Sequence, residues 1–279
     1  ALRYPESVPF WQAGHGADWS GPYFGYETVD LMIGESLLAT QGGHYAQWLA
    51  DQHPEVIPLY QPEAALAGPL EDLEEAWTSG VPDALHYNTW IADRAIDFLD
   101  RTKGPFMMFV SSPDPHHPFS PPLPWADLFD PADMPAPDVV PGELDRMPDY
   151  VRARLSADWI DNNAPAVEQG GMTQTDAICD ESMARAIALT RGMEAQIDHQ
   201  IGRVLEKLEA LGKTEDTIIL FTSDHGEFLG QHGLLHKGPP PYGDLNRVSF
   251  VMAGPYVPEG LSTLAPSSHL DIMPTLLEL

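Results

Sequence analysis

The chain has few positive charges for its length. Of its 279 residues, 14 are Lys or Arg and 42 are Asp or Glu, which gives a formal net charge of -28. Between Arg3 and Arg94 there is no Lys or Arg, whereas the same interval holds fourteen Asp and Glu residues. A surface of this charge repels nucleic acid, anionic lipid and polysulfated chains. We therefore expect no nucleic-acid partner and no membrane-surface partner.

Cysteine and long apolar runs are also scarce. The single cysteine, Cys179, excludes an internal disulfide framework, and we expect it to be a buried or half-buried bystander. No apolar stretch approaches the roughly 20 residues of a membrane-spanning helix. A hydrophobic content of 43% permits a large core. The chain starts with Ala1 rather than Met, so the absence of a signal peptide leaves localisation open between cytoplasm and periplasm.

The first half of the chain is predicted to be mostly irregular. Residues 1 to about 87 are rich in Pro, Gly, Trp and Tyr and indicate long loops with short elements. Within them, Glu71–Ala76 is predicted to be an acidic, helical, solvated patch. A helix is expected near residues 89–102, followed by a strand at Phe106–Val110. Residues 113–180 begin with many prolines and are expected to be an irregular insertion.

The second half has clearer periodicity. Apolar residues recur every three or four positions over Ser182–Leu211, which predicts a long helix packed along a sheet, with Gly212 as its cap. Val248–Ala253 is predicted to be a strand. The order helix, strand, helix, strand favours an α/β architecture.

One strand ends in a candidate metal site. Thr217–Phe221 is apolar and β-branched, which is typical of a strand covered on both faces of a parallel sheet. Asp224 and His225 follow it, where ligands bind in open α/β sheets. A carboxylate beside an imidazole suits a divalent metal, although an Asp-x-Gly sequence is also ordinary turn chemistry. Lys237 is one of only two Lys or Arg residues after Lys213, and we expect it to hold an anion.

Four further histidines are candidates with alternatives left open. His116 follows the strand predicted at Phe106–Val110, in a loop that prolines make rigid, so it is a candidate functional histidine, although its spacing alone does not favour that role. Its neighbour His117 could exchange roles with it. His232 and His236, together with His225, offer an alternative multi-histidine zinc site.

These motifs together resemble the sulfatase family of the alkaline-phosphatase superfamily. The matching segments are Ser223–Glu227, Gly230–Gly233, Lys237–Gly238, Tyr242–Val248, Gly254–Pro255, Pro105–Phe119 and His269–Leu279. They extend from about residue 105 to Leu279, and residues 21–49 match more loosely. The resemblance implies a three-layer α/β/α sandwich around a mostly parallel sheet, with residues 1–279 forming a single, incomplete catalytic domain.

The resemblance also assigns roles to individual residues. Asp224 and His225 would be metal ligands, and Lys237 and His116 would be the catalytic residues that contact the sulfate and its leaving-group oxygen. The implied ion is divalent, calcium first, with manganese or zinc as alternatives. The implied nucleophile is a formylglycine made from Cys or Ser.

Three sequence elements of such enzymes do not occur in this chain. They are an Asp-Asp pair, a Cys- or Ser-x-Pro-x-Arg motif and a Gly-Lys-x-His element. All three would lie before residue 1, and the small C-terminal subdomain would lie after Leu279. The 279-residue chain is therefore expected to be inactive by itself.

Three functions remain as hypotheses. The first is metal-dependent hydrolysis of sulfate esters, with a small anionic ester as substrate because of the strong negative charge. The second is hydrolysis of phosphonate monoesters or phosphodiesters on the same scaffold. The third is a non-catalytic homologue that acts as a binding protein. The sequence does not set the oligomeric state.

Overall fold

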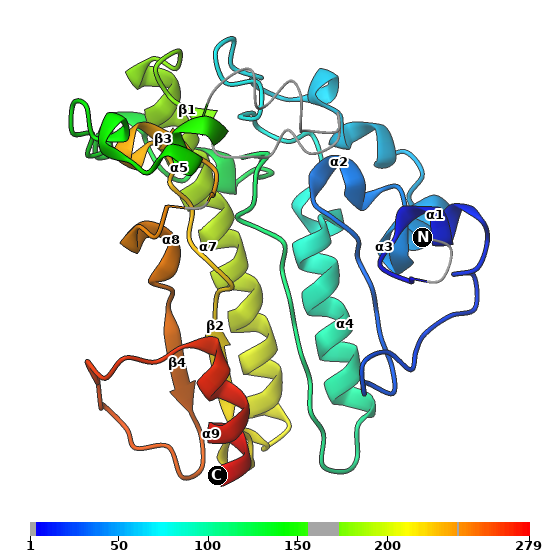
Figure 1. Cartoon of the computed structure of the whole chain (residues 1–279). Helices are drawn as coiled ribbons and strands as arrows, with labels where there is room; N and C mark the ends of the chain where they lie inside the picture. The colour runs from blue at the N-terminus through cyan, green and yellow to red at the C-terminus, as the bar shows by residue number, and fades with distance from the viewer. Residues whose placement is uncertain (1–3, 156–172, 239) are drawn as a thin grey trace.

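The structure, a computed structural model, describes residues 4–155, 173–238 and 240–279 (Figure 1). Its α-helices are α1 (Val8–Gln12), α2 (Ser36–Ala39), α3 (Gly43–Gln52), α4 (Tyr87–Arg101), α5 (Asp149–Arg154), α7 (Asp180–Ala210), α8 (Gly243–Asn246) and α9 (Ile272–Glu278). Its strands are β1 (Thr173–Gln174), β2 (Ile219–Thr222), β3 (Leu234–Leu235) and β4 (Phe250–Ala253). Short 3-10 helices are η1 (Ile57–Tyr60), η2 (Pro62–Ala64), η3 (Asp83–Leu85), η4 (Trp125–Asp127), η5 (Pro131–Asp133), η6 (Leu144–Arg146), η7 (Thr214–Asp216), η8 (Gln231–Gly233) and η9 (His269–Asp271).

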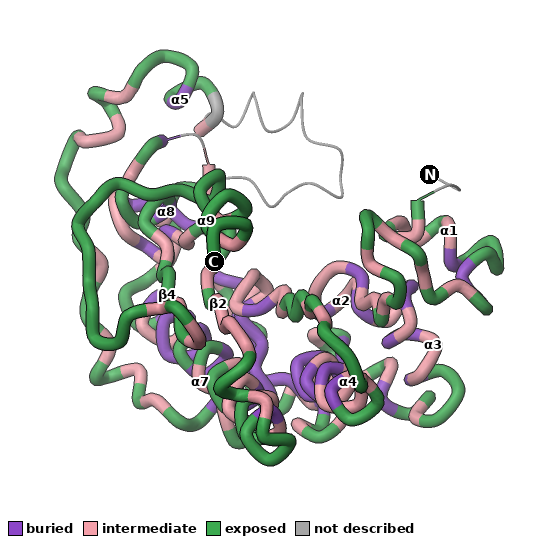
Figure 2. The backbone as a smooth tube through the Cα atoms, turned by 90° about the horizontal axis from the view of Figure 1, so that it is seen from below, coloured by how far each residue is buried: buried purple, intermediate pink, exposed green. Residues whose placement is uncertain are grey.

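Helices α4 and α7 form the centre of the molecule and lie side by side (Figures 1 and 2). Both were predicted from apolar periodicity, and each begins two residues before its predicted start. The amide of Asn88 donates to Gln196 at 3.0 Å near the start of the contact, and Lys207 pairs with Asp100 at 2.6 Å near its end. The helices therefore run in the same direction. None of the helices in the described ranges is long and apolar enough to cross a membrane.

The glycine predicted to end α7 lies immediately beyond it. Leu211 is the last, partly helical residue, and Gly212 follows with a φ of 67°. The left-handed region is accessible to glycine without a steric penalty, so the chain can reverse here and enter β2.

The strands pair differently from the prediction. In the described part of the chain, β2 pairs antiparallel with β4 and β1 pairs antiparallel with β3. The predicted strand Thr217–Phe221 is found as β2, but it is not covered on both faces, since Phe221 is 43% exposed. Phe106–Val110 forms no strand among these residues, and Met107 and Phe109 are exposed. An apolar run becomes a strand only where a neighbour accepts its hydrogen bonds, and no such neighbour is described here.

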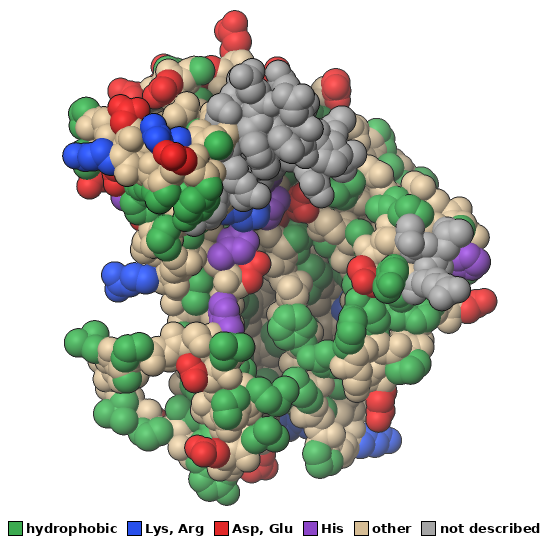
Figure 3. Space-filling view, viewed as in Figure 1, with side chains coloured by type: hydrophobic (Ala, Val, Ile, Leu, Met, Phe, Trp, Pro, Cys, Tyr) green, Lys and Arg blue, Asp and Glu red, His purple; other side chains and the backbone are tan. Residues whose placement is uncertain are grey.

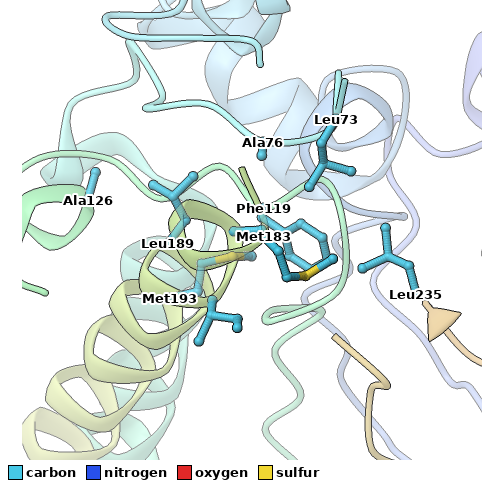
Figure 4. Close-up of a cluster of buried hydrophobic side chains, with 10 residues drawn as sticks. Leu73, Ala76, Phe119, Ala126, Met183, Leu189, Met193 and Leu235 are labelled. Carbon is cyan, nitrogen blue, oxygen red and sulfur yellow. The ribbon is translucent and has the colours of Figure 1, made fainter. Parts of the chain in front are cut away.

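The main core cluster packs one face of α7 against three distant segments (Figure 4). Met183, Leu189 and Met193 come from α7, and all are at most 5% exposed. They meet Phe119 and Leu235, which are equally buried. Leu73 and Ala76 close the cluster from the acidic segment. The core therefore fixes the loops next to residues 75, 117 and 236.

The acidic segment Glu71–Ala76 is not helical, contrary to the prediction. It forms turns and isolated bridges, one of which pairs Ala76 with Phe119 in parallel. Asp72 accepts a hydrogen bond from the backbone N–H of Cys179 at 2.8 Å, and this bond lowers the pKa of Asp72 to about 2. These long-range partners outweigh the local preference for a helix. Cys179 itself is exposed at the start of α7, so the expectation that it is buried or half-buried was wrong.

The Pro-rich segment is irregular over the residues that the structure describes. Residues 113–155 contain short 3-10 turns and the six-residue helix α5. Residues 156–172 of the predicted insertion lie outside the described residues. The division of the chain into one domain with an insertion at 113–180 therefore stays a prediction.

Candidate active site

Two of the four predicted site residues meet directly. The Nζ atom of Lys237 lies 2.6 Å from Nε2 of His116. The other ring nitrogen of His116, Nδ1, is 2.6 Å from the carbonyl oxygen of His117. A carbonyl can only accept, so Nδ1 carries the proton and Nε2 accepts from the Lys237 ammonium. The pair therefore consists of a lysine ammonium in contact with an imidazole whose orientation is fixed by a second hydrogen bond.

A buried polar network holds the loop that carries His116. Asp114, two residues earlier, is only 6% exposed and accepts hydrogen bonds from Tyr87 and from the Asn88 amide of α4, the latter at 2.7 Å. The Ser112 hydroxyl donates to the side-chain amide oxygen Oδ1 of Asn88 at 2.6 Å. Because Asn88 also contacts α7, the loop is anchored to both central helices.

Burial of Asp114 predicts a pH-dependent stability. Removal from water raises the pKa of Asp114 from 3.8 to about 7. Between these pH values the folded protein keeps a proton that the unfolded chain releases, so this group makes the free energy of unfolding fall as pH rises from about 4 to 7. Asp114→Asn cannot ionise and should flatten that decline. Urea unfolding at pH 5 and pH 8 measures it, and an unchanged difference between the two pH values would contradict the assignment.

The other two predicted residues form an exposed pair after β2. The side chain of Asp224 is 84% accessible and that of His225 41%, and Oδ2 and Nε2 lie 3.6 Å apart. His225 Nδ1 is 2.8 Å from the Gly226 carbonyl oxygen, which leaves Nε2 as the nitrogen toward Asp224. His269, just before α9, reaches the carbonyl oxygen of Ser223 at 2.8 Å. A carboxylate and an imidazole nitrogen on one turn fit a divalent ion, but they are only part of a ligand set.

Glu227, which was not singled out from the sequence, lies near enough to the His116–Lys237 pair for their charges to act on it. Burial raises its pKa, while the positive charge that His236, Lys237 and His116 carry when protonated opposes the shift. Glu227 therefore lies within electrostatic range of the His116–Lys237 pair, three residues after Asp224. Its position in the motif Ser223–Glu227 was the available signal.

The alternative zinc site of His225, His232 and His236 does not form in the described part of the chain. His232 stacks on Tyr242, with ring centroids 3.7 Å apart, and contacts Glu143 and Asp244. Burial by itself lowers the pKa of His232, but the hydrogen bonds and negative charges of Glu143 and Asp244 together raise it by more, so the net shift is upward. His236 contacts a different segment, because its Nε2 lies 2.9 Å from Glu75 Oε2. The three histidines thus have separate partners.

A different group of potential metal ligands lies beside the His116–Lys237 pair. Among the residues that the structure describes, Glu75, His117 and His236 are the group of three His, Cys, Asp or Glu side chains whose ligand atoms all lie within 4.8 Å of one another. The rings of His116 and His117 are 4.0 Å apart, so this group adjoins the His116–Lys237 pair. Figure 3 shows histidine side chains gathered along the middle of one face.

Comparison with known proteins places these residues in a family. The family model described as Sulfatase matches residues 69–279. An arylsulfatase of Clostridium perfringens is 31% identical over 212 residues, which are 73% of this chain and 40% of that protein. The multifunctional alkaline phosphatase superfamily protein PehA of Trinickia caryophylli is 33% identical over 207 residues, which are 72% of this chain and 39% of that protein. The chain thus spans about two fifths of the length of these relatives.

A solved structure agrees with the sequence comparison. The crystal structure of a phosphonate monoester hydrolase of Agrobacterium radiobacter superposes with a TM-score of 0.61 at 26% identity. The match covers 76% of this chain and 41% of that one. The predicted α/β fold class is confirmed by this likeness, although strand pairing within the described residues is antiparallel.

Proposed function

Because the chain belongs to the sulfatase family, we propose that the protein is a metal-dependent hydrolase of sulfate esters with a small substrate. The observation that carries the proposal is the 2.6 Å contact between Lys237 and His116, which are 121 positions apart in the sequence. An anionic ester needs a fixed positive charge for its oxygens and a proton for its departing oxygen. The contact supports the proposal because it brings a cation and a possible proton donor side by side.

The two residues divide these tasks. The Lys237 ammonium binds an ester oxygen and stabilises the negative charge that develops on it. The proton held between Lys237 Nζ and His116 Nε2 is the one available to the leaving oxygen. The hydrogen bond from His116 Nδ1 to the His117 carbonyl fixes the orientation of the ring during this transfer. The chain has no Cys- or Ser-x-Pro-x-Arg motif, so no nucleophile is assigned to its residues.

A divalent ion is implied by the family, and the exposed turn after β2 suits it. Asp224 and Nε2 of His225 would hold the ion, and the hydrogen bond from His269 to Ser223 steadies their turn. When bound, the ion supplies positive charge next to the ester oxygens. Calcium is our first assignment, with manganese or zinc as alternatives, because one imidazole ligand favours transition metals only slightly.

Hydrolysis of phosphonate monoesters is the second candidate function. The observation in its favour is the superposition on a phosphonate monoester hydrolase at 26% identity. Sulfate esters remain preferred because the matching family model and the arylsulfatase both indicate them. The net charge of -28 disfavours large polysulfated substrates for either function.

Relative turnover of two aryl esters tests the proposal. The protein in its native length, expressed from its own gene, should hydrolyse 4-nitrophenyl sulfate with a kcat/KM at least tenfold above that for an aryl phosphonate monoester. The reverse order would establish the second function. Absence of both activities, with the protein folded and loaded with metal, would exclude both hydrolases and favour a binding protein.

A further inference from the structure

We propose that Glu75, His117 and His236 form a binding site for a zinc-like transition-metal ion, distinct from the Asp224–His225 pair. The fold brings the three residues together from distant segments. Glu75 precedes Ala76, which bridges to Phe119, and the backbone N–H of Phe119 donates to the Glu75 carbonyl at 2.7 Å. His117 lies two residues before Phe119. Their neighbours Ala76, Phe119 and Leu235 share one core cluster (Figure 4).

The backbone also fixes His236 in place. The N–H of Phe228 donates to the His236 carbonyl at 3.0 Å, and His236 has a φ of 67°. A left-handed conformation is uncommon for a residue other than glycine, and its cost persists only where surrounding contacts enforce it. His236 is 2% exposed, so the enforced conformation directs an imidazole into the interior.

The spacing of the ligand atoms suits one ion. One ligand atom from each side chain lies within 4.8 Å of the others, and Glu75 Oε2 is 2.9 Å from His236 Nε2. Zinc bonds of about 2.0–2.2 Å in tetrahedral geometry place ligand atoms roughly 3.3 Å apart. Small shifts of the side chains would therefore bring all three ligand atoms to one ion. Two histidines and one glutamate with an open fourth position are a known zinc ligand set.

A hydrogen bond between His236 and Glu75, without a metal ion, explains fewer features of this group than a bound ion does. It leaves unexplained the Nδ1 atom of His117, which is buried and has no hydrogen-bond partner among the described residues. A buried, unpaired polar atom is unfavourable, and coordination through Nδ1 would satisfy it. Glu75 is 39% accessible, which provides an entrance from solvent.

The proposed ion would join three segments that converge on the active site. His117 adjoins His116 in the sequence, and His236 adjoins Lys237. An ion bound by both His117 and His236 would therefore help to fix the distance between their neighbours His116 and Lys237. The inference concerns metal binding by this chain and does not depend on which ester the protein hydrolyses.

Zinc binding by the 279-residue chain tests the proposal without any activity assay. After chelator treatment, isothermal titration with Zn²⁺ should show one tight equivalent, and Co²⁺ in its place should give the intense visible absorption of a tetrahedral site. Glu75→Gln, His117→Asn and His236→Asn should each weaken the affinity at least tenfold. Asparagine is chosen at position 236 because it tolerates a positive φ.

Matched controls separate this site from others. His232→Asn also replaces a histidine with positive φ (60°), and Asp224→Asn removes a ligand of the exposed pair, yet neither should change the tight equivalent. Circular dichroism identifies any variant that fails to fold, in which case the remaining two triad variants decide. Unchanged affinity in the folded triad variants, no tight equivalent in the wild type, or loss in Asp224→Asn alone would each overturn the proposal.

Discussion

Replacing Lys237 with alanine is expected to lower kcat for sulfate-ester hydrolysis by the native-length protein on the order of 10²–10³-fold, the usual cost of removing one group that stabilises transition-state charge. Lys237 contacts His116 at 2.6 Å, so the substitution removes the cation and also leaves His116 Nε2 without its donor. Initial rates with 4-nitrophenyl sulfate at saturating substrate measure the effect. Lys213→Ala is the matched control, because its ammonium donates to the Thr102 carbonyl beyond α4 and lies over the Phe106 ring, not beside His116.

The contact between the two residues also predicts how their effects combine. His116→Ala should cost on the order of 10²–10⁴-fold, and more for an alkyl sulfate than for an aryl sulfate, because the poorer leaving group needs the proton more. Since each residue orients the other, the double variant should lose less than the product of the two single effects. Fully multiplicative losses, or equal losses for both substrates, would contradict a shared proton between Lys237 and His116.

Local sequence patterns predicted the long elements of the fold well. Helices α4 and α7 each begin within two residues of their predicted starts, because an apolar stripe and a glycine stop are encoded within one segment. The strand predicted at Val248–Ala253 is found as β4. The antiparallel pairing of β2 with β4 was not predicted, since an apolar run indicates a strand but not which neighbour it has.

In the candidate site, too, local motifs could be predicted from the sequence, whereas contacts between distant segments could not. His116, Asp224, His225 and Lys237 stand in motifs that can be recognised locally, and the structure brings His116 and Lys237 into contact. The role of Glu75 could not be found in this way. Its acidic neighbours indicated a solvated helix, whereas its carboxylate contacts a histidine 161 positions away. Only the tertiary structure, through the Ala76–Phe119 bridge, brings such residues together.

The turn that carries Asp224 and His225 depends on a glycine that packs against backbone. A Cβ atom placed on Gly226 would lie 1.7 Å from the carbonyl oxygen of Asp244 and 3.2 Å from Cα of Leu245. The N–H of Gly226 donates to the Leu245 carbonyl at 2.9 Å, so the turn cannot move away from α8 without losing this hydrogen bond. The steric conflict involves backbone on both sides and cannot be relieved by turning a side chain.

Gly226→Ala is therefore expected to lower the free energy of unfolding by about 3 kcal/mol, at the upper end of the usual cost of overpacking. It should also move Asp224 and His225 away from α8 and weaken divalent-metal binding at that pair. Urea unfolding and calcium titration measure the two effects. Gly202→Ala on α7 is the control, because its added Cβ meets nothing within 4 Å and alanine stabilises a helix interior by up to about 1 kcal/mol. If Gly226→Ala instead proved as stable as Gly202→Ala, the close approach of the turn to Asp244 could not exist in the folded protein, and the placement of Asp224 and His225, the two proposed metal ligands, would have to be revised with it.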